Sequence, residues 1–512
     1  MEAEAFDYIV CGAGSAGCAV AGRLSEDTAA RVLLIEAGGN DDLPEVMTPS
    51  QWVHNLGSER DWGFVGEPNP HLNGRAIPLN MGRVLGGGSS INVMVWARGH
   101  RADWDRFEQA VDDPGWGYEA VLDIYRRVED WHGAPDARRR GVGGPVYVAP
   151  AANPQSVARA MLQSAADLGI PVYQSPNGEM MEGPGGASIN DLIVHGGQRR
   201  SMFRAYVYPR IGQGNLRVLT DTLVTGLVWQ GTRVVGVNVL RHGKPHTYRA
   251  DREVILSLGA IHTPKVLMQS GIGPADALRR HGIAVKQDLP GVGQNHQDHV
   301  SFGCIFEFST PQAIGNGGSE ATLYWKSDSS LKQPDMFHCQ VEFPVPSDAT
   351  AALGVPVHGW TMFAGLAHPK SRGEVRLSGP SPHDPAIIAP NTLSHPDDVR
   401  AALASIEMCR ELADQKPLRD LIRREAMPGP LDTTSMEQFA RNAAVTYWHQ
   451  AGTAKMGLGA DAVVNAKLQV YGVDNLRIAD ASVMPELPSG NTMAPCVVIG
   501  ERAASLIREA HA

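Results

Sequence analysis

The sequence predicts an α/β fold with two parts, one built on a parallel sheet and the other on an antiparallel sheet. The first part rests on a short apolar run at residues 8–11, which breaks into the glycine-rich stretch 12–17 and continues as a helical pattern to Leu24. A second apolar run, 31–35, ends in Glu36. From residue 300 to 376 the pattern changes to long alternation of apolar and polar residues, typical of antiparallel strands with one covered face.

The strand, turn and helix around residues 12–17 predict a dinucleotide-binding unit. Gly12 permits the tight turn, Gly14 lets the backbone approach a pyrophosphate, and Gly17 lets the helix pack on the strand. The helix N-terminus directs unpaired N–H groups and positive potential toward the phosphates. Glu36 stands where such a unit places the carboxylate that binds a ribose hydroxyl, and it repels a 2′-phosphate. The ligand is therefore expected to be of the FAD or NAD type and not NADP.

The composition sets the size and the class of protein. The chain has 512 residues, 43% of them hydrophobic, which is enough for two or three packed domains. A formal net charge of −10 argues against a nucleic-acid partner. The first strand follows the N-terminus without a basic and apolar leader, and no apolar stretch is long enough to span a bilayer, so we expect a cytoplasmic enzyme without stable membrane insertion. The six cysteines show neither CxxC nor metal-ligand spacing, so neither disulfides nor a metal site is expected.

Two further glycine-rich stretches interrupt the pattern. The stretch 82–92 contains three consecutive glycines, Gly86 to Gly88, which suit a backbone lying against a flat ligand. The stretch 138–145 combines three arginines with glycines and a proline, and we interpret it as a solvated loop at a domain boundary.

The middle of the chain returns to strands and then changes character. Buried strand patterns occur at residues 215–220, 222–228 and 252–260. Longer alternating strands at 301–308 and 336–343 belong to the second part, and helical patterns follow at 397–414 and 436–441.

Two stretches near the C-terminus go beyond the needs of a nicotinamide dehydrogenase. One is Trp-His-Gln-Ala-Gly-Thr at residues 448–453, and the other runs from a strand ending in Asp480 to a helix that opens near Asn491. The N-terminus of that helix supplies positive potential suited to the pyrimidine end of a reduced, anionic flavin. These stretches favour FAD over NAD.

With these motifs in order, the whole chain resembles the glucose–methanol–choline (GMC) family of flavoprotein oxidoreductases, above all its choline dehydrogenase-like and alcohol oxidase-like members. The resemblance rests on five motifs: residues 12–17 with Glu36, residues 82–92 through Asp105, residues 259–264 through 270–273, His449 with Gly452 and Thr453, and Asp480-Ala481 with Asn491. The family fold implied is a Rossmann-like FAD-binding domain of discontinuous segments joined to a smaller antiparallel-sheet substrate-binding domain with helices. We expect residues 1–150, 196–298 and 446–512 in the FAD-binding domain, and 151–195 and 299–445 in the substrate-binding domain.

The resemblance also implies how FAD lies. Its adenosine would contact Glu36 and the backbone of Val224, its pyrophosphate Gly14 and Ser15, and its isoalloxazine the 88–95 stretch and the His449 side. The cofactor-binding residues implied are Gly12, Gly14, Ser15, Gly17, Glu36, Ala37, Arg83, Val84, Gly88, Ser89, Asn92, Val93, Met94, Val95, Val224, Trp448, Asp480, Ala481, Thr492 and Met493.

The activity implied is FAD-dependent oxidation of a primary or secondary alcohol to an aldehyde or ketone, with His449 and Asn491 as catalytic residues. Passing an alcohol proton, with a pKa of roughly 15.7, to an imidazole near 6.5 is uphill by about 9 units. General-base catalysis supplies only ~10²–10⁴-fold, so the site must also stabilise the developing alkoxide while hydride leaves for flavin N5. His449 would be the base, losing its function below a pKa near 6–7, and Asn491 would hydrogen-bond the substrate oxygen.

Other functions remain open from the sequence. A flavin-containing lyase of the hydroxynitrile lyase type would use the same histidine as base without redox turnover. An NAD-dependent dehydrogenase leaves the Gly86 and Asn491 stretches unexplained, and a flavin-bearing binding protein leaves the His449/Asn491 pair unexplained. The alcohol, the oligomeric state and the electron acceptor, O₂ or another, stay undetermined.

Two residues depart from the family pattern. Gln450 replaces the proline that often follows the histidine and is expected to loosen the loop backbone. Ile91 stands where some relatives carry a histidine bonded covalently to flavin, so noncovalent FAD is expected. His338 and Glu307, on expected substrate-domain strands, are interpreted as structural or exposed residues.

Overall fold

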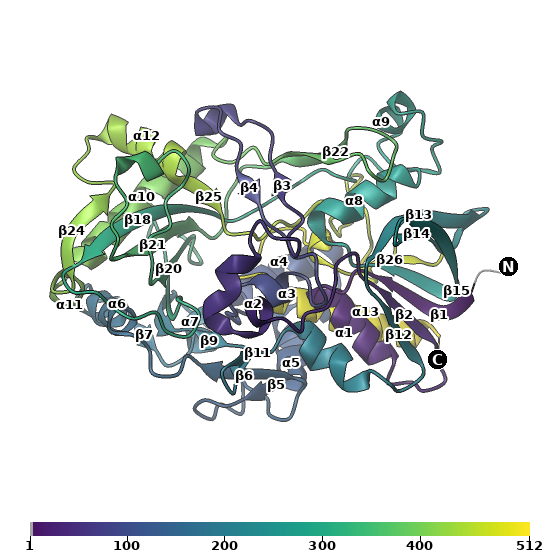
Figure 1. The fold of residues 1–512 in the computed structure, drawn as a ribbon, viewed down its shortest axis with the longest axis horizontal. Helices are drawn as coiled ribbons and strands as arrows, with labels where there is room; N and C mark the ends of the chain where they lie inside the picture. The colour runs from purple at the N-terminus through teal and green to yellow at the C-terminus, as the bar shows by residue number, and fades with distance from the viewer. Residues whose placement is uncertain (1–3, 512) are drawn as a thin grey trace.

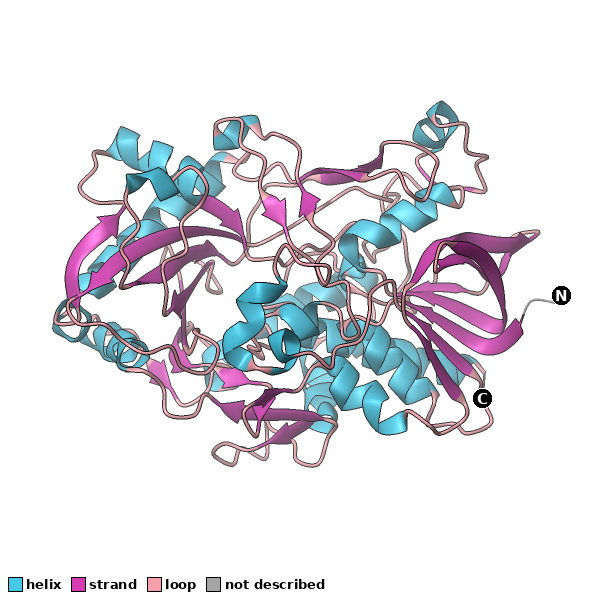
Figure 2. Cartoon of the chain, viewed as in Figure 1, coloured by secondary structure: helices cyan, strands magenta, loops and turns pink. Residues whose placement is uncertain are grey.

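The computed structural model describes residues 4–511 as an elongated molecule with a large sheet at each end and helices between them (Figure 1). This is a mixed α/β fold, with a mainly parallel sheet on the right of Figure 2 and an antiparallel sheet on the left. The predicted fold class is confirmed.

The first sheet has seven strands and holds the predicted nucleotide-binding unit. Its strands are β1 Glu4–Cys11, β2 Val32–Ile35, β12 Leu216–Leu219, β13 Thr222–Gln230, β14 Arg233–Arg241, β15 Lys244–Leu256 and β26 Leu476–Ile478. The order is β12-β2-β1-β15-β14-β13, and the second half of β15 pairs with β26. β12, β2, β1, β15 and β26 are parallel, while β13 and β14 form an antiparallel extension.

The parallel strands are apolar on both faces because helices cover them. Val10 pairs with Leu34 on one side and Ile255 on the other, and all three side chains are fully buried. The helices α1 Ser15–Leu24 and α13 Met493–Ala510 pack against each other beside this sheet (Figure 1). The beginning and the end of the chain therefore share one core.

The second sheet has eight strands and was expected from the alternating pattern. Its strands are β7 Val172–Tyr173, β8 Gly186–Ile189, β18 Val300–Phe308, β19 Ala321–Trp325, β20 Met336–Val341, β21 Gly359–Leu366, β24 Ile422–Met427 and β25 Ala444–Thr446. The order is β24-β18-β21-β20-β19-β8-β7, with β25 beside β18. The helix α10 Pro396–Asp414 packs on β21, and its buried Ile406 and Leu412 share a core with Phe302 and Trp360.

The remaining elements are short and join or cover the two sheets. The helices are α2 Pro44–Met47, α3 Gly88–Ile91, α4 Arg101–Val111, α5 Tyr118–Val128, α6 Ser156–Asp167, α7 Glu179–Glu182, α8 Gly259–Gln269, α9 Ala275–Arg280, α11 Lys416–Arg419 and α12 Thr433–Ala443. Short 3₁₀- or π-helical segments are η1 Pro49–Asn55, η2 Pro70–Leu72, η3 Pro114–Trp116, η4 Phe203–Val207, η5 Tyr208–Arg210, η6 Ala351–Leu353 and η7 Ala481–Val483. The small sheets consist of β3 Phe64–Val65, β4 Pro78–Leu79, β5 Glu129–Trp131, β6 Val146–Pro150, β9 Asp191–Leu192, β10 Val194–His195, β11 Gln198–Arg199, β16 Ile272–Gly273, β17 Gln287–Asp288, β22 Glu374–Leu377 and β23 Ala386–Ala389.

The arginine-rich stretch 138–145 is not the solvated loop that its composition predicts. Arg140 is buried, and its guanidinium pairs with Glu129 at 3.0 Å and Asp191 at 2.8 Å. It also lies 3.4 Å from the ring centroid of Trp131. β6, which follows this stretch, pairs with β9, so the stretch is anchored on both sides.

The domain limits stay a prediction, although each large sheet draws its strands from the segments expected for it. The β6–β9 pairing joins residues on either side of the expected limit at 150. Within residues 4–511, no helix is long and apolar enough to cross a membrane.

Candidate active site

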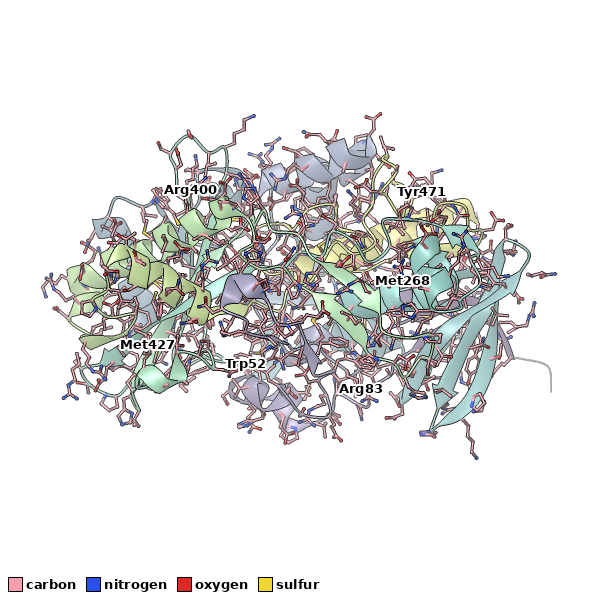
Figure 3. All side chains as sticks on the ribbon, turned by 90° about the horizontal axis from the view of Figure 1, so that it is seen from above. Trp52, Arg83, Met268, Arg400, Met427 and Tyr471 are labelled. Atoms are coloured by element: carbon pink, nitrogen blue, oxygen red, sulfur yellow. The ribbon has the colours of Figure 1, made fainter. Side chains whose placement is uncertain are left out.

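A cavity of about 510 Å³ lies where the two sheets face each other, at the carboxyl ends of the parallel strands. Ligands of open α/β sheets bind at this edge. From above, Trp52, one of the lining residues, lies toward the middle of the molecule (Figure 3). The predicted residues that line the cavity are Gly12, Gly14, Ser15, Glu36, Ala37, Gly88, Ser89, Asn92, Val93, Val95, Val224, Trp448, His449, Asp480, Ala481, Asn491, Thr492 and Met493.

Gly17, Arg83, Val84 and Met94 lie outside this lining. Gly17 faces the turn, because a Cβ there would lie 2.0 Å from the carbonyl oxygen of Gly12. The Arg83 guanidinium lies over the ring of Trp62, 5.1 Å from its centroid, and the side chains of Val84 and Met94 are fully buried. These four residues therefore support the cavity wall from behind.

The glycines of the lining are of two kinds. At packing glycines an added Cβ would collide with the protein, and at cradle glycines it would meet open space. At Gly12, where φ is +100°, a Cβ would lie 2.2 Å from the carbonyl oxygen of Ser257, so the turn needs glycine. At Gly14 and Gly88 no atom beyond the chain neighbours and the local helix backbone lies within 4 Å of the position that a Cβ would take. Glycine is therefore not required there by the packing of other residues, whereas Gly259, with equal space, has a φ of +80° that itself favours glycine. The open space in front of the Gly14 and Gly88 backbones fits a large cofactor lying against them.

Two carboxylates follow the carboxyl ends of strands at the edge of the parallel sheet that faces the cavity. Glu36, after β2, accepts hydrogen bonds from the N–H groups of Ala13 (3.0 Å) and Gly38 (2.9 Å), and burial raises its pKa to about 7. Asp480, after β26, accepts from the N–H of Gly259 (2.9 Å) and the hydroxyl of Thr263 (2.6 Å), and burial raises its pKa too. Each carboxylate fixes a loop around the cavity. Asp480 also accepts from the N–H and the hydroxyl of Ser482, so both of its oxygens are fully used within the protein, whereas Glu36 keeps acceptor lone pairs that fit a ribose hydroxyl.

A buried cation holds the glycine-rich stretch 86–92 in place. Arg199 is fully buried, and it donates to the carbonyl oxygens of Val46 (2.8 Å) and Ser89 (3.1 Å) and to Oδ1 of Asn92 (2.6 Å). Burial lowers its pKa to about 9. Sequence analysis did not single out Arg199, because an arginine in the two-residue strand β11, followed by Arg200, carries no local signal of burial.

His449 and Asn491 meet at the other end of the cavity. Asn491 Nδ2 lies 3.2 Å from His449 Nε2. The helix α13 begins at Met493 with Thr492 as its N-cap residue, so Asn491 is not the cap, and its side chain is free to face the histidine. The other ring nitrogen, Nδ1, lies 2.8 Å from Nδ1 of His299. His299 directly precedes β18 and was missed by sequence analysis, although the stretch Asn-His-Gln-Asp-His at 295–299 is unusually rich in imidazoles.

The environment of His449 keeps its imidazole neutral. Its side chain is 7% exposed, and burial lowers its pKa from the ordinary 6.5 to about 3. The ring of Tyr447 lies parallel to it, with centroids 5.8 Å apart. The expectation of a pKa near 6–7 is therefore wrong for this environment, because desolvation disfavours the charged imidazolium.

The loop that carries His449 is tied down by one buried carboxyl group. Asp298 accepts from the N–H of His449 (2.9 Å), from Gln450 Nε2 (3.0 Å) and from the hydroxyl of Thr446. Burial raises the pKa of Asp298 to about 7. The expectation that Gln450 loosens this loop is wrong, since its amide supplies two of the bonds that fix it, to Asp298 and to Thr446.

The part of the lining that comes from the second sheet is uncharged. Its residues are Asn190, Ser319, Thr322, Phe337, Cys339, Val341, Phe343, Pro344, Val345, Pro346, Phe363 and Tyr447. Among the described lining residues, the carboxylates are Glu36 and Asp480, both on the first sheet, and none is a lysine or arginine.

His338 and Glu307 take the structural roles expected of them. His338 is fully buried outside the lining, with Nε2 3.0 Å from the carbonyl oxygen of Ser405. Glu307 pairs with Arg423 (2.9 Å) and Arg424 (2.6 Å) on the outer strand of the sheet. Over residues 4–511, no group of three or more histidine, cysteine or acidic side chains could hold a metal ion.

Taken together, the fold and the site define an α/β protein of the nucleotide-binding type with a histidine–asparagine pair facing a mostly apolar cavity. Family models described as GMC oxidoreductase match residues 6–301 and 369–500. The chain belongs to the GMC oxidoreductase family.

Individual relatives cover the whole chain. It is 35% identical to mitochondrial choline dehydrogenase of Homo sapiens, over 99% of this chain and 90% of that protein. It is also 35% identical to an oxygen-dependent choline dehydrogenase of Rhizobium etli, over 98% and 95% of the two chains. The crystal structure of pyridoxine 4-oxidase from "Mesorbium loti" aligns with a TM-score of 0.93 at 32% identity, over 99% of both chains. FAD is the cofactor expected for this family, and the open glycine cradles fit it.

Proposed function

We propose that this GMC oxidoreductase oxidises an alcohol to the aldehyde or ketone, with His449 as the base that accepts the hydroxyl proton at Nε2. The observation that carries the proposal is the 3.2 Å pair between His449 Nε2 and Asn491 Nδ2 in the cavity wall. FAD, when bound, supplies the acceptor for the hydride at N5. Glu36 and Gly14 would hold it, with Asp480 fixing the loop at Gly259 beside it, and the departure of hydride and proton together balances the oxidation.

His449 and Asn491 have different roles toward the substrate hydroxyl: His449 accepts its proton and Asn491 donates a hydrogen bond to its oxygen. A substrate O–H placed beside both nitrogens replaces their direct contact. It donates to Nε2 of His449, while Asn491 Nδ2 donates to the same oxygen as negative charge develops on it. Because His449 is desolvated, its protonated form is stabilised only when a negative charge stands beside it, as the alkoxide does. The pair therefore favours proton transfer only with substrate in place.

The uncharged half of the cavity supports a neutral substrate. Burying an unpaired cation costs several kcal/mol, whereas an aromatic face returns about 2 kcal/mol when desolvated. Phe337, Phe363 and Tyr447 offer such faces, but no carboxylate of the described lining lies on this side. We therefore propose that the enzyme prefers neutral apolar or aromatic alcohols to choline, whose name two of its relatives carry.

Anaerobic mixing of the holoenzyme with a panel of alcohols tests both statements. Bleaching of the flavin absorbance is expected with 3,3-dimethylbutan-1-ol, the neutral isostere of choline, and with benzyl alcohol. The rate constant per unit concentration should be higher for the neutral isostere than for choline. A preference for choline would overturn the neutral-substrate proposal, and turnover of a hydroxynitrile without bleaching would favour a lyase instead.

We also propose noncovalent FAD, from Ile91, and a cytoplasmic location. O₂ and other electron acceptors are distinguished by following reoxidation of the bleached enzyme in air and with a quinone or dye under nitrogen.

A further inference from the structure

A second histidine, His299, forms a continuous hydrogen-bonded path from the protein backbone to the proposed base. His299 is fully buried just before β18. Its Nε2 lies 3.0 Å from the carbonyl oxygen of Ala367, and its Nδ1 lies 2.8 Å from Nδ1 of His449. The two rings are nearly perpendicular, at 88°, so the nitrogens meet edge to edge.

The protons on this path follow from the chemistry of its ends. A carbonyl oxygen only accepts, so Nε2 of His299 carries a proton. If His299 is neutral, its Nδ1 then has a lone pair and accepts from Nδ1–H of His449. The neutral His449 consequently has no proton on Nε2, the atom next to Asn491.

We infer that His299 is a positioning residue that fixes the tautomer of His449, leaving the lone pair of Nε2 directed at the substrate hydroxyl. This inference rests on the proposed role of His449 as base. Without His299, only the amide of Asn491 would favour a free Nε2, and that amide could instead turn its oxygen toward a protonated Nε2. A His449 protonated there would be unable to accept a proton from an alcohol.

The alternative arrangement has a charged His299. With protons on both of its nitrogens, His299 would donate to Nδ1 of His449 and place the remaining proton of His449 on Nε2. Burial opposes this arrangement, because it holds the pKa of His299 well below its usual range, and the neighbouring His368 and His449 lower it further. The buried Asp298 contacts the backbone N–H of His449 and not the ring of His299.

The direct test is ¹⁵N NMR of the holoenzyme labelled at histidine, with the signals of His449 assigned by comparison with a His449→Gln variant. We expect a pyrrole-type Nδ1 and a pyridine-type Nε2 on His449 at pH 7. A pyrrole-type Nε2 on a neutral His449, or a doubly protonated His299, would overturn the inference. This readout is independent of turnover, so it separates failure of the inference from failure of the proposed function.

Variants of His299 give the functional test. His299→Phe keeps the ring volume and removes the acceptor, while His299→Asn retains an oxygen that can accept from Nδ1–H. Loss of one neutral hydrogen bond and of the correct tautomer should slow flavin reduction by about 5- to 50-fold in the Phe variant, with substrate affinity within about 3-fold of wild type. The Asn variant should recover most of that loss.

The loss in His299→Phe should also be constant from pH 6 to 9, since no group in the path changes its charge there. A Phe variant that reduces its flavin at the wild-type rate would overturn the inference, as would an Asn variant no faster than Phe. The matched control is His338→Phe, another fully buried histidine bonded to a carbonyl, which should lower thermal stability without changing flavin reduction. If His299→Phe does not bind FAD, the Asn variant and the NMR spectrum decide.

Discussion

In the proposed mechanism, the chemistry of the site depends on the single side chain of His449, because its Nε2 is the nitrogen that lies beside Asn491 in the cavity wall. His449→Ala should therefore slow flavin reduction by ~10²–10⁴-fold, the usual contribution of a general base. Bound FAD should be retained, since the cradle glycines and Glu36 line the opposite end of the cavity from His449, at the edge of the parallel sheet. Anaerobic rapid mixing measures this step alone, and a rate within a few-fold of wild type would make His449 a packing residue.

The lowered pKa of His449 predicts an unusual pH profile. A histidine whose folded pKa is depressed to about 3 stays neutral, and competent as a base, as the pH falls through 6.5. The protonation of His449 should thus change flavin reduction by less than about 2-fold between pH 5 and 9, where a solvated histidine would lose about 97% of its base form by pH 5.

The carboxyl group of Asp298 lies close to His449 and can add its own titration to the pH profile of flavin reduction. A variant of Asp298 separates the two contributions. Asp298 has a pKa raised to about 7 and bonds to the backbone of His449. An inflection near pH 7 that disappears in Asp298→Asn belongs to this carboxyl group. A fall in rate centred at 6.5 that survives in Asp298→Asn would contradict the desolvated histidine.

At the scale of single residues, the sequence identifies the proposed base, His449, but not His299, the residue inferred to orient it. His449 and Asn491 stand in recognisable motifs, whereas His299 acts through His449 from 150 residues away. Gln450 was misinterpreted for a related reason, since its partner Asp298 comes from a loop distant in sequence.

Among the elements, the turn between β1 and α1 allows a matched test of its two kinds of glycine. In Gly17→Ala the new Cβ would lie 2.0 Å from the carbonyl oxygen of Gly12, so we expect a loss of ~1–3 kcal/mol in the stability of the apoprotein. In Gly14→Ala the Cβ meets no atom of the protein, and φ is −74°, so apoprotein stability should stay within about 0.5 kcal/mol.

For FAD affinity, the larger effect is expected from Gly14→Ala. Gly14→Ala fills the space left for FAD and should weaken its binding at least about 10-fold, a cost of ~1.4 kcal/mol. Thermal unfolding of the apoproteins and fluorescence titration with FAD measure the two effects. Unchanged FAD affinity in Gly14→Ala would contradict the cradle.

The elements that the sequence predicted are those with a strong period or a strong break. β1, α1, β2, β18 and α10 were predicted within a few residues, because each is a single run with one buried face or two. β14 was not identified, since Gly236 and Asn238 interrupt its apolar run. The stretch around Arg140 was misjudged because its ion-pair partners lie on other strands.

For the whole molecule, we predict that FAD leaves when the fold is lost. Ile91, at 5% exposure, offers no nucleophilic atom for a covalent bond to flavin. After precipitation with acid or heat, the yellow colour should stay in the supernatant, and the pellet should be colourless. Flavin that remains with the washed pellet would show a covalent link through another residue.

The packing of α13 on α1 also has a consequence for how the protein is made. α1 emerges from the ribosome about 470 residues before α13, which at ~5–20 residues per second is a delay of roughly 25–90 s. During that time α1 lacks the helix that packs on it, and β15 lacks its partner β26, so apolar faces and an unpaired strand edge are exposed to chaperones. Asp480, Asn491 and Met493 are among the last residues of the cavity lining in the sequence, so the lining of the nascent chain is complete only after they have been added.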